Sequence, residues 1–421
     1  MNDSMMDLVL SSENMQKAWK QVKRNGGSPG VDGMTLNRFP EYLRKRWNKI
    51  KRALLLGYYV PSPVLRVEIP KKSGGKRKLG IPTILDRVIQ QAISQVLNPI
   101  FDPGFSDSSF GFRPRRSAHG AIWQVNNYVK SGYGYAVDLD LEKFFDTVNH
   151  DVLMRHVALK VRDKSVLKLI GRYLRAGIKD REGNLLPTEI GTPQGGPLSP
   201  LLSNILLDNL DKELEGRNLR FARYADDVLI VAKSLGEGKS ILTEVSNYLS
   251  EKLKLVVNRV KSKVCKISEC SFLGFTFRGK KIRWSESSFR EFHYQLKQLT
   301  RRSWGVSMEY RFGKLSQYIR GWMNYYGISQ YYRPIQSIDK WLRRRIRMCY
   351  WKQWRYPRTK VRKLMDLGVP KDFAIMTGAS SKSYWHLSKS YSTNAGMSNE
   401  WLEKQGLINI KDLWCKAQGY V

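Results

Sequence analysis

Two apolar runs that carry acidic residues at one end constrain the fold of this chain more than any other feature. Residues 221–232 read as two strands joined by a tight turn, with Asp226 and Asp227 in the turn. A second run, Tyr-Ala-Val-Asp-Leu-Asp, reads as a buried strand with Asp138 and Asp140 on one face, because side chains alternate along a strand. A sheet with carboxylates at its strand ends is therefore expected.

Other segments have the periodicity of ordinary strands and helices. The alternation at 64–69, a glycine-rich turn and the run 77–81 predict a β-hairpin. Helices are expected over 86–100, 199–214 and 237–253, one or two helices over 152–174, and a short strand over 271–277. The sequence changes character near residue 285, because residues 301–360 hold 15 Lys and Arg, 14 aromatic residues and two acids. That later segment is expected to form a separate helical domain.

The charge balance points to a polyanionic partner. The 421 residues include 73 Lys and Arg against 37 Asp and Glu, a formal net charge of +36, whereas solubility alone needs a net charge of roughly 2–8 for a small domain. Nucleic acid is the simplest such partner, and a membrane surface is a weaker alternative because neither end shows a lipidation signal. No apolar run reaches ~18 residues, so no membrane span is expected. The four cysteines are widely spaced and the first residues lack a basic leader, which favours a reducing, cytoplasmic setting.

Acidic side chains at strand ends in a basic protein indicate a cation site. Two Mg²⁺ ions about 4 Å apart, held by carboxylates and substrate phosphates, are the usual device for in-line phosphoryl transfer. The alternative for Asp226 and Asp227 is an ordinary hairpin turn, in which Asp is common. These residues alone leave both interpretations open.

Short motifs follow one another in a set order along the chain. They are Ile-Pro-Lys-Lys-Ser-Gly-Gly-Lys-Arg at 69–77, Ser-Phe-Gly-Phe-Arg-Pro at 109–114, Asp-Leu-Glu-Lys-Phe-Phe-Asp at 140–146, Gly-Thr-Pro-Gln-Gly-Gly-Pro-Leu-Ser-Pro at 191–200, Tyr-Ala-Asp-Asp at 224–227, Val-Asn-Arg-Val-Lys-Ser at 257–262, Phe-Leu-Gly-Phe at 272–275 and Gly-Trp-Met-Asn-Tyr-Tyr at 321–326. Together they resemble the group II intron reverse transcriptases, also called maturases, over nearly the whole chain.

The resemblance implies an α+β fold of the right-hand polymerase type. Fingers and palm, with an antiparallel palm sheet, would precede an α-helical thumb and a small C-terminal helical region that binds DNA. The expected domains are an N-terminal extension with the start of the fingers at 1–60, the fingers and palm at 61–285, the thumb or maturase-specific domain at 286–365, and the C-terminal DNA-binding region at 366–421.

The resemblance also assigns roles to the carboxylates. Asp140 heads the family's D-x-x-x-F-F-D pattern, whereas Asp138 becomes a neighbouring polar residue. The implied catalytic residues, which are also the implied ligands of two Mg²⁺ ions, are Asp140, Asp226 and Asp227. The carbonyl of Leu141 is implied as a further ligand.

Five residues match the family's nucleotide pocket by position. Lys71 and Arg77 flank the hairpin turn and would contact the triphosphate, Lys as a point charge and Arg as a planar fork. Phe145 would lie under the incoming sugar, where a bulky ring excludes a 2′-hydroxyl; a place in the core is its alternative. Gln194 stands in a glycine-rich stretch that lets backbone approach the nucleotide. Lys261 would lie near the leaving pyrophosphate as a general acid, or else be a solvated surface lysine.

The segment at 341–355 combines an apolar helical seam with arginines. Leu342 and Ile346 belong to the seam. Arg343, Arg344 and Arg347 are expected on the polar faces, where they would bind RNA phosphates. An amphipathic core helix with a solvated face is a compatible interpretation.

The function implied by the resemblance is RNA-directed DNA synthesis together with binding of group II intron RNA, assisting splicing and target-primed mobility. The partners would be intron RNA, an RNA template with a DNA primer, target DNA and dNTPs, without a membrane, in the bacterial cytoplasm near the nucleoid. No acidic or Cys/His constellation after residue 285 suits an RNase H or endonuclease site, so an endonuclease-lacking, group IIC-like subclass is expected. The alternatives are a free-standing relative in DNA repair and a splicing cofactor that only binds RNA.

Overall fold

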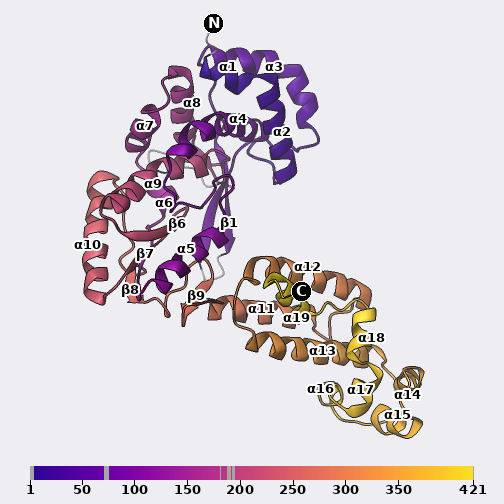
Figure 1. Ribbon diagram of the computed structural model, residues 1–421. Helices are drawn as coiled ribbons and strands as arrows, with labels where there is room; N and C mark the ends of the chain where they lie inside the picture. The colour runs from indigo at the N-terminus through magenta and orange to yellow at the C-terminus, as the bar shows by residue number, and fades with distance from the viewer. Residues whose placement is uncertain (1–3, 71–74, 181, 187–190, 192–194, 421) are drawn as a thin grey trace. The chain divides into compact units, whose positions relative to one another are not determined.

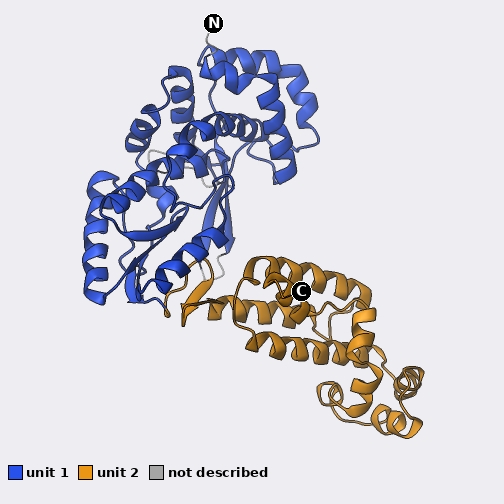
Figure 2. Cartoon of the chain, in the orientation of Figure 1, with its two compact units in different colours: residues 1–267 blue, residues 268–421 orange. Residues whose placement is uncertain are grey.

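The computed structural model describes residues 4–70, 75–180, 182–186, 191 and 195–420. The chain has two compact units, residues 1–267 and residues 268–421 (Figure 2). None of the helices in the described ranges is both long enough and apolar enough to cross a membrane. The finer division into N-terminal extension, fingers and palm, thumb and C-terminal region stays a prediction.

A four-stranded antiparallel sheet in the first unit carries the strands that end in carboxylates (Figure 1). Its strands lie in the order β6 (Arg220–Tyr224), β7 (Asp227–Ala232), β3 (Tyr135–Leu139) and β8 (Lys263–Lys266). Helix α10 (Leu235–Lys252) lies against β3, β7 and β8, while α5 (Ala118–Lys130) and α9 (Ser199–Gly216) lie against β6. These helices bury the apolar residues of β7. The strand predicted before Asp140 and the two strands predicted at 221–232 are confirmed.

A second sheet in the same unit contains the predicted β-hairpin. Its strands lie in the order β2 (Lys76–Ile81), β1 (Val64–Pro70), β4 (Ile178–Lys179) and β5 (Leu185–Leu186). Strands β1 and β2 pair antiparallel from Leu65 opposite Ile81 to Pro70 opposite Lys76. Toward the turn the hairpin becomes exposed, so its basic side chains reach solvent.

The remaining helices of the first unit pack mainly against other helices. They are α1 (Met5–Leu10), α2 (Ser12–Asn25), α3 (Phe39–Leu55), α4 (Ile84–Phe101), a 3-10 turn at Asp102–Gly104, α6 (Phe144–Thr147), α7 (His150–Ala158) and α8 (Lys164–Leu174). Helix α4 is buried over most of its length because α1 and α2 pack against it. The helices predicted from apolar spacing are confirmed, and the segment 152–174, predicted as one or two helices, forms two, α7 and α8.

The described residues of the second unit are helical apart from one hairpin and the connecting turns. The hairpin consists of β9 (Phe275–Arg278) and β10 (Lys281–Trp284). The helices are α11 (Glu286–Leu299), α12 (Met308–Tyr326), α13 (Arg333–Gln353), α14 (Pro357–Asp366), α15 (Lys371–Gly378), α16 (Tyr384–Leu387), α17 (Tyr391–Gly396), α18 (Asn399–Lys404) and α19 (Ile410–Ala417). They pack around a core of their own that includes Phe292, Ile346 and Trp351.

The strand predicted over 271–277 is wrong for its first half. Phe272 and Phe275 exchange two backbone hydrogen bonds of 2.9 Å and close a tight turn between them. Leu273 and Gly274 in that turn have φ angles of 49° and 81°, the left-handed region that a two-residue hairpin turn requires. The apolar side chains gave this turn the look of a strand.

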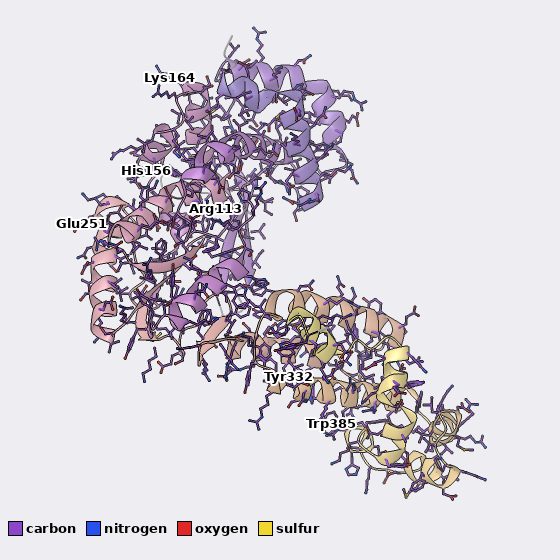
Figure 3. The ribbon with its side chains drawn as sticks, viewed as in Figure 1. Arg113, His156, Lys164, Glu251, Tyr332 and Trp385 are labelled. Carbon is purple, nitrogen blue, oxygen red and sulfur yellow. The ribbon has the colours of Figure 1, made fainter. Side chains whose placement is uncertain are left out.

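The placement of Arg347 on a solvent-facing side of α13 is also wrong, whereas Arg343 and Arg344 are half-buried. Arg347 is 6% exposed and donates to the Met397 carbonyl at 2.8 Å. Arg343 pairs with Asp339 at 2.8 Å. The guanidinium of Arg344 lies 3.6 Å from the ring centroid of Trp385, which Figure 3 labels. Helices α16 to α18 cover these faces of α13, so all three cations are engaged within the fold.

Candidate active site

Two strand ends bring the predicted carboxylates together. Strands β3 and β7 pair antiparallel up to Leu139, which lies opposite Val228. Continued by one residue, this register sets Asp140 opposite Asp227, and opposed residues on paired strands have Cβ atoms about 4.5–5.5 Å apart. Asp226 precedes Asp227 in the turn between β6 and β7. Three carboxylates from two distant segments therefore share one sheet edge.

The pKa of Asp227 shows that these charges act on one another. It is raised to about 6, and the largest cause is the dehydration of its carboxylate by the surrounding protein. The next causes are the nearby charges of Asp226, Asp138 and Asp140. Arg77 opposes the shift, so the tip of the β1–β2 hairpin also bears on this site. Like charges crowded in this way favour the binding of a cation.

Asp227→Asn should raise the thermal stability of the metal-free protein. Because the folded-state pKa of Asp227 lies above its ordinary value, the wild type loses stability as pH rises through about 6, and the Asn variant escapes this loss. The difference in melting temperature should therefore be larger at about pH 7.5 than at about pH 5 in EDTA. Mg²⁺ should raise the melting temperature of the wild type and not that of the variant. A variant less stable than wild type at both pH values would contradict the crowding of charge.

Backbone contacts fix Asp140 just beyond the end of β3. Its amide donates to Ser262 Oγ at 3.0 Å, and its carbonyl accepts from Asn258 N at 2.8 Å. Lys261 Nζ lies 3.4 Å from Asp140 Oδ2, and 64% of its side chain is exposed. Leu141 follows and is buried. It forms an isolated antiparallel β-bridge with Val257. The structure thus brings Lys261 to the carboxylates, while its role as a general acid stays a prediction.

A buried arginine holds the acidic turn from inside the protein. Arg223 and Asp211 form an ion pair with both side chains 0% exposed and Nη2 2.5 Å from Oδ2. The Arg223 guanidinium also donates to three other oxygens: the Ala225 carbonyl at 3.0 Å, Asn204 Oδ1 at 2.9 Å and Ser109 Oγ at 2.8 Å. Ala225 has a φ of 58°, a left-handed conformation that costs a non-glycine residue roughly 1–2 kcal/mol. The Arg223 contacts hold the turn in this conformation.

Sequence reasoning missed this buried pair. Arg223 interrupts the apolar run that begins at Phe221, within β6, and Asp211 lies among the leucines of α9. Charged residues at such positions are almost always paired when they are buried. The available signal was a charged residue inside each of two apolar segments. That signal alone does not predict that Arg223 pairs with Asp211.

The motif at 109–114 supports the same turn from the other side. A Cβ atom on Gly111 would lie 2.3 Å from Ala225 N, so glycine is required for this close approach. Arg113, labelled in Figure 3, donates to the Ser109 carbonyl at 2.9 Å and pairs with Asp102 at 2.7 Å. The motif therefore supports the turn that carries Asp226 and Asp227.

The predicted nucleotide pocket is described in part. Lys71 and Gln194 lie outside the described residues. Phe144 is buried, whereas Phe145, whose ring centroid lies 5.2 Å away, is half-buried and reaches the surface. Arg77 lies exposed on β2. Of the two adjacent rings, Phe145 is thus the one able to meet a ligand.

The two described ends of the motif at 191–200 approach this pocket closely. Gly191 has a φ of 92°, and a Cβ there would lie 2.8 Å from the Phe145 carbonyl oxygen. His150 Nε2 lies 2.5 Å from the Gly191 carbonyl oxygen. At Gly195 a Cβ would lie 2.6 Å from the carbonyl oxygen of Gly80 on β2. The motif is therefore anchored beside Phe145 at one end and beside the hairpin at the other.

The donor set suits a hard divalent cation that is completed by its substrate. In the described part of the chain, no three side chains of Asp, Glu, His or Cys already converge as a ready cage. Mg²⁺ usually keeps several waters and takes one or two carboxylates together with substrate phosphates, so it needs no such cage. The mutual repulsion of acids around Asp227 is what a cation would relieve.

Comparison with known families identifies both units. The family described as "Reverse transcriptase (RNA-dependent DNA polymerase)" matches residues 69–277. The family described as "Group II intron, maturase-specific domain" matches residues 289–368. The first match includes the three carboxylates at the sheet edge, and the second includes α12 and α13.

Individual relatives show the same pattern. The chain is 32% identical over 327 residues to Protein YkfC of Escherichia coli (strain K12), covering 68% of this chain and 84% of that protein. It is 35% identical over 250 residues to Group II intron-encoded protein LtrA of Lactococcus lactis subsp. cremoris, covering 59% of this chain and 40% of LtrA. Identity to the Putative COX1/OXI3 intron 2 protein of Saccharomyces cerevisiae is 31% over 350 residues, 69% of this chain and 40% of that protein. The chain spans less than half the length of these last two relatives.

Proposed function

The chain belongs to the family of group II intron reverse transcriptases and maturases, and on this premise we propose that it copies RNA into DNA at this sheet edge and assists the splicing and mobility of a group II intron. The observation that carries the proposal is the meeting of Asp140 with Asp226 and Asp227 at paired strand ends, within the range matched by the polymerase family.

We assign Asp140, Asp226 and Asp227 as ligands of two Mg²⁺ ions, with the Leu141 carbonyl as a further ligand. Such ions, when bound, stabilise the charge that develops on the attacking and leaving oxygens of phosphoryl transfer. The chain itself holds the carboxylates in position, since Arg223 fixes the turn that carries two of them. Lys261 is proposed to give a proton to the leaving pyrophosphate, and its 3.4 Å contact with Asp140 supports this role.

Arg77, Phe145 and Lys261 are the described residues among the proposed dNTP contacts. Arg77 bears electrostatically on Asp227, which supports a triphosphate between the hairpin and the acidic edge. Lys71 and Gln194 match family motif positions that contact the nucleotide, and this match alone supports them as further dNTP contacts. Phe145, half-buried beside Gly191, supports a steric check on the sugar.

Phe145→Ala should relax the discrimination between dNTPs and ribonucleotides. Removal of the ring opens space for a 2′-hydroxyl, so the ratio of kcat/KM for rNTP to that for dNTP should rise by about tenfold or more. Steady-state primer extension with each nucleotide measures this ratio. Phe144→Leu is the matched control, because Phe144 is core and its shortening should lower stability and leave the ratio unchanged. An unchanged ratio in Phe145→Ala would return Phe145 to a packing role.

The proposed partners are group II intron RNA, an RNA template with a DNA primer, dNTPs and target DNA, in a bacterial cytoplasm and near the nucleoid. Because Arg343, Arg344 and Arg347 are engaged in the fold, we place the phosphate contacts of the second unit on exposed cations such as Lys297 and Arg320. The direct test of the function is extension of a DNA primer on an annealed RNA template with Mg²⁺ and dNTPs. RNA binding without any extension would leave only the splicing-cofactor role.

A further inference from the structure

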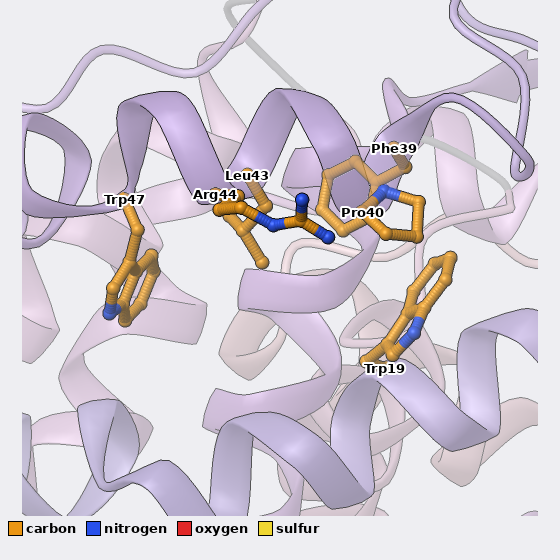
Figure 4. A pocket seen from close by; sticks show the side chains of 6 residues that line it. All are labelled: Trp19, Phe39, Pro40, Leu43, Arg44 and Trp47. Atoms are coloured by element: carbon orange, nitrogen blue, oxygen red, sulfur yellow. The ribbon is translucent and has the colours of Figure 1, made fainter.

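An apolar groove lies between α2 and α3 of the first unit. It consists of two adjoining hollows of about 300 and 250 Å³, which have Trp19, Leu43 and Trp47 as common wall residues. Phe39 closes the first hollow (Figure 4), and Met15 lines the second. Neither the proposed polymerase chemistry nor the motifs at 69–275 use these residues.

The walls of the groove are apolar surfaces that reach solvent. Trp19, Leu43 and Trp47 are only partly buried. The Trp19 ring already packs on Phe39, with ring centroids 4.9 Å apart, so the ring is held in position as a wall. Large apolar surfaces that are fixed and open in this way usually mark a binding site.

The rim of the groove is strongly basic. Helix α3 carries six Lys and Arg residues against the single acid Glu41. Lys45 pairs with Glu41 at 2.9 Å, so that acid is neutralised within the helix. Arg44 and Lys51 line the groove itself and are exposed. An occupant must therefore combine apolar side chains with negative charge.

We propose that this groove binds an acidic protein segment that inserts two large apolar side chains, one into each hollow. The charge of the rim complements Asp and Glu residues, and the walls complement Phe, Leu or Ile. A nucleobase fits the hollows less well, because its polar edges need hydrogen-bond partners. Around the first hollow the polar side-chain groups are the Arg44 guanidinium and two indole N–H groups, which are all donors, so the N–H donors of a base would be left without acceptors.

The test uses the full chain and a synthetic peptide. A fluorescein-labelled acidic peptide of about 15 residues with two Phe anchors is compared, by fluorescence anisotropy, with the same peptide carrying Ser at both anchor positions. The anchored peptide should bind at least about tenfold more tightly, because burial of aromatic anchors dominates affinity in such grooves. Trp47→Ala removes one wall, and Arg44→Glu reverses the charge of the rim; each should weaken binding by about tenfold or more.

Two matched variants on α5 serve as controls. Trp123→Ala removes an exposed indole, and Lys130→Glu reverses an exposed charge, so both should leave affinity within about twofold. Arg44 is exposed, and its variant keeps the test decisive if Trp47→Ala unfolds, which circular dichroism reports. Equal affinity for the anchored and Ser peptides would overturn the proposal, because it would show that charge attraction alone accounts for the binding. Loss of affinity for a labelled single-stranded RNA in Trp47→Ala, with no peptide binding, would overturn it in favour of nucleic acid.

Discussion

Asp226→Ala is expected to lower the rate of primer extension by about three orders of magnitude or more. Removal of one metal ligand forfeits about 4 kcal/mol of transition-state stabilisation, and each 1.36 kcal/mol is a factor of ten in rate. Single-turnover extension on a short RNA template with saturating Mg²⁺ and dNTPs measures the loss. RNA affinity should stay near that of the wild type, because the substitution removes a negative charge and no phosphate contact.

The control for this variant is Asp151→Ala. Asp151 lies exposed in the first turn of α7 and is not among the carboxylates that raise the pKa of Asp227. The Asp151→Ala variant should therefore extend the primer at the wild-type rate. Near wild-type activity in Asp226→Ala would show that the sheet edge of β3 and β7 is not the catalytic centre.

Arg223→Met should destabilise the protein by roughly 3–5 kcal/mol and reduce extension in the fraction that still folds. The substitution leaves Asp211 fully buried without its partner, and breaking a buried ion pair from one side costs about this much. Burial already raises the pKa of Asp211, and Arg223 is the group that counteracts it. Urea unfolding measures the loss of stability, and extension below the unfolding transition measures the loss of activity.

Comparison with an exposed pair isolates the effect of burial. Arg290 and Glu286 on α11 are 74% and 86% exposed in their side chains, so Arg290→Met should change stability by less than about 1 kcal/mol. Arg223→Met with Asp211→Leu should recover part of the stability, since no charge is then left unpaired. Activity should not recover with it, because the Ala225 carbonyl still lacks its donor. Recovery of both would make Arg223 a packing residue alone.

The strands and the acidic turn could be predicted because local pattern decides them. The alternation before Asp140 and the apolar runs around Asp226 and Asp227 each require a strand end at the acids. The family motifs then linked the two segments, which lie more than eighty residues apart. The pairing register that sets Asp140 opposite Asp227 agrees with that link.

Contacts between distant segments were the part that local pattern could not supply. The helical spacing of α13 separated Leu342 and Ile346 from the arginines correctly, yet it gave no sign that α17 and α18 cover the side of Arg347. The pKa of Arg347 is lowered to about 10, first by burial and then by Arg343, which marks it as part of the interior. The apolar stripe of an amphipathic helix predicts the face that packs into the core. It does not predict that further helices will cover the polar faces.

The contact between Gly111 and Ala225 has a consequence for building chimeras from related enzymes. The two segments lie more than a hundred residues apart along the chain and pack without space for one added carbon at Gly111. Beside this contact, Ser109 and Arg223 form an isolated parallel β-bridge. A crossover point placed between them would join the loop of one parent to the turn of the other. Exchange libraries should therefore move residues 102–114 and 204–227 as one inherited block, although each looks self-contained along the chain.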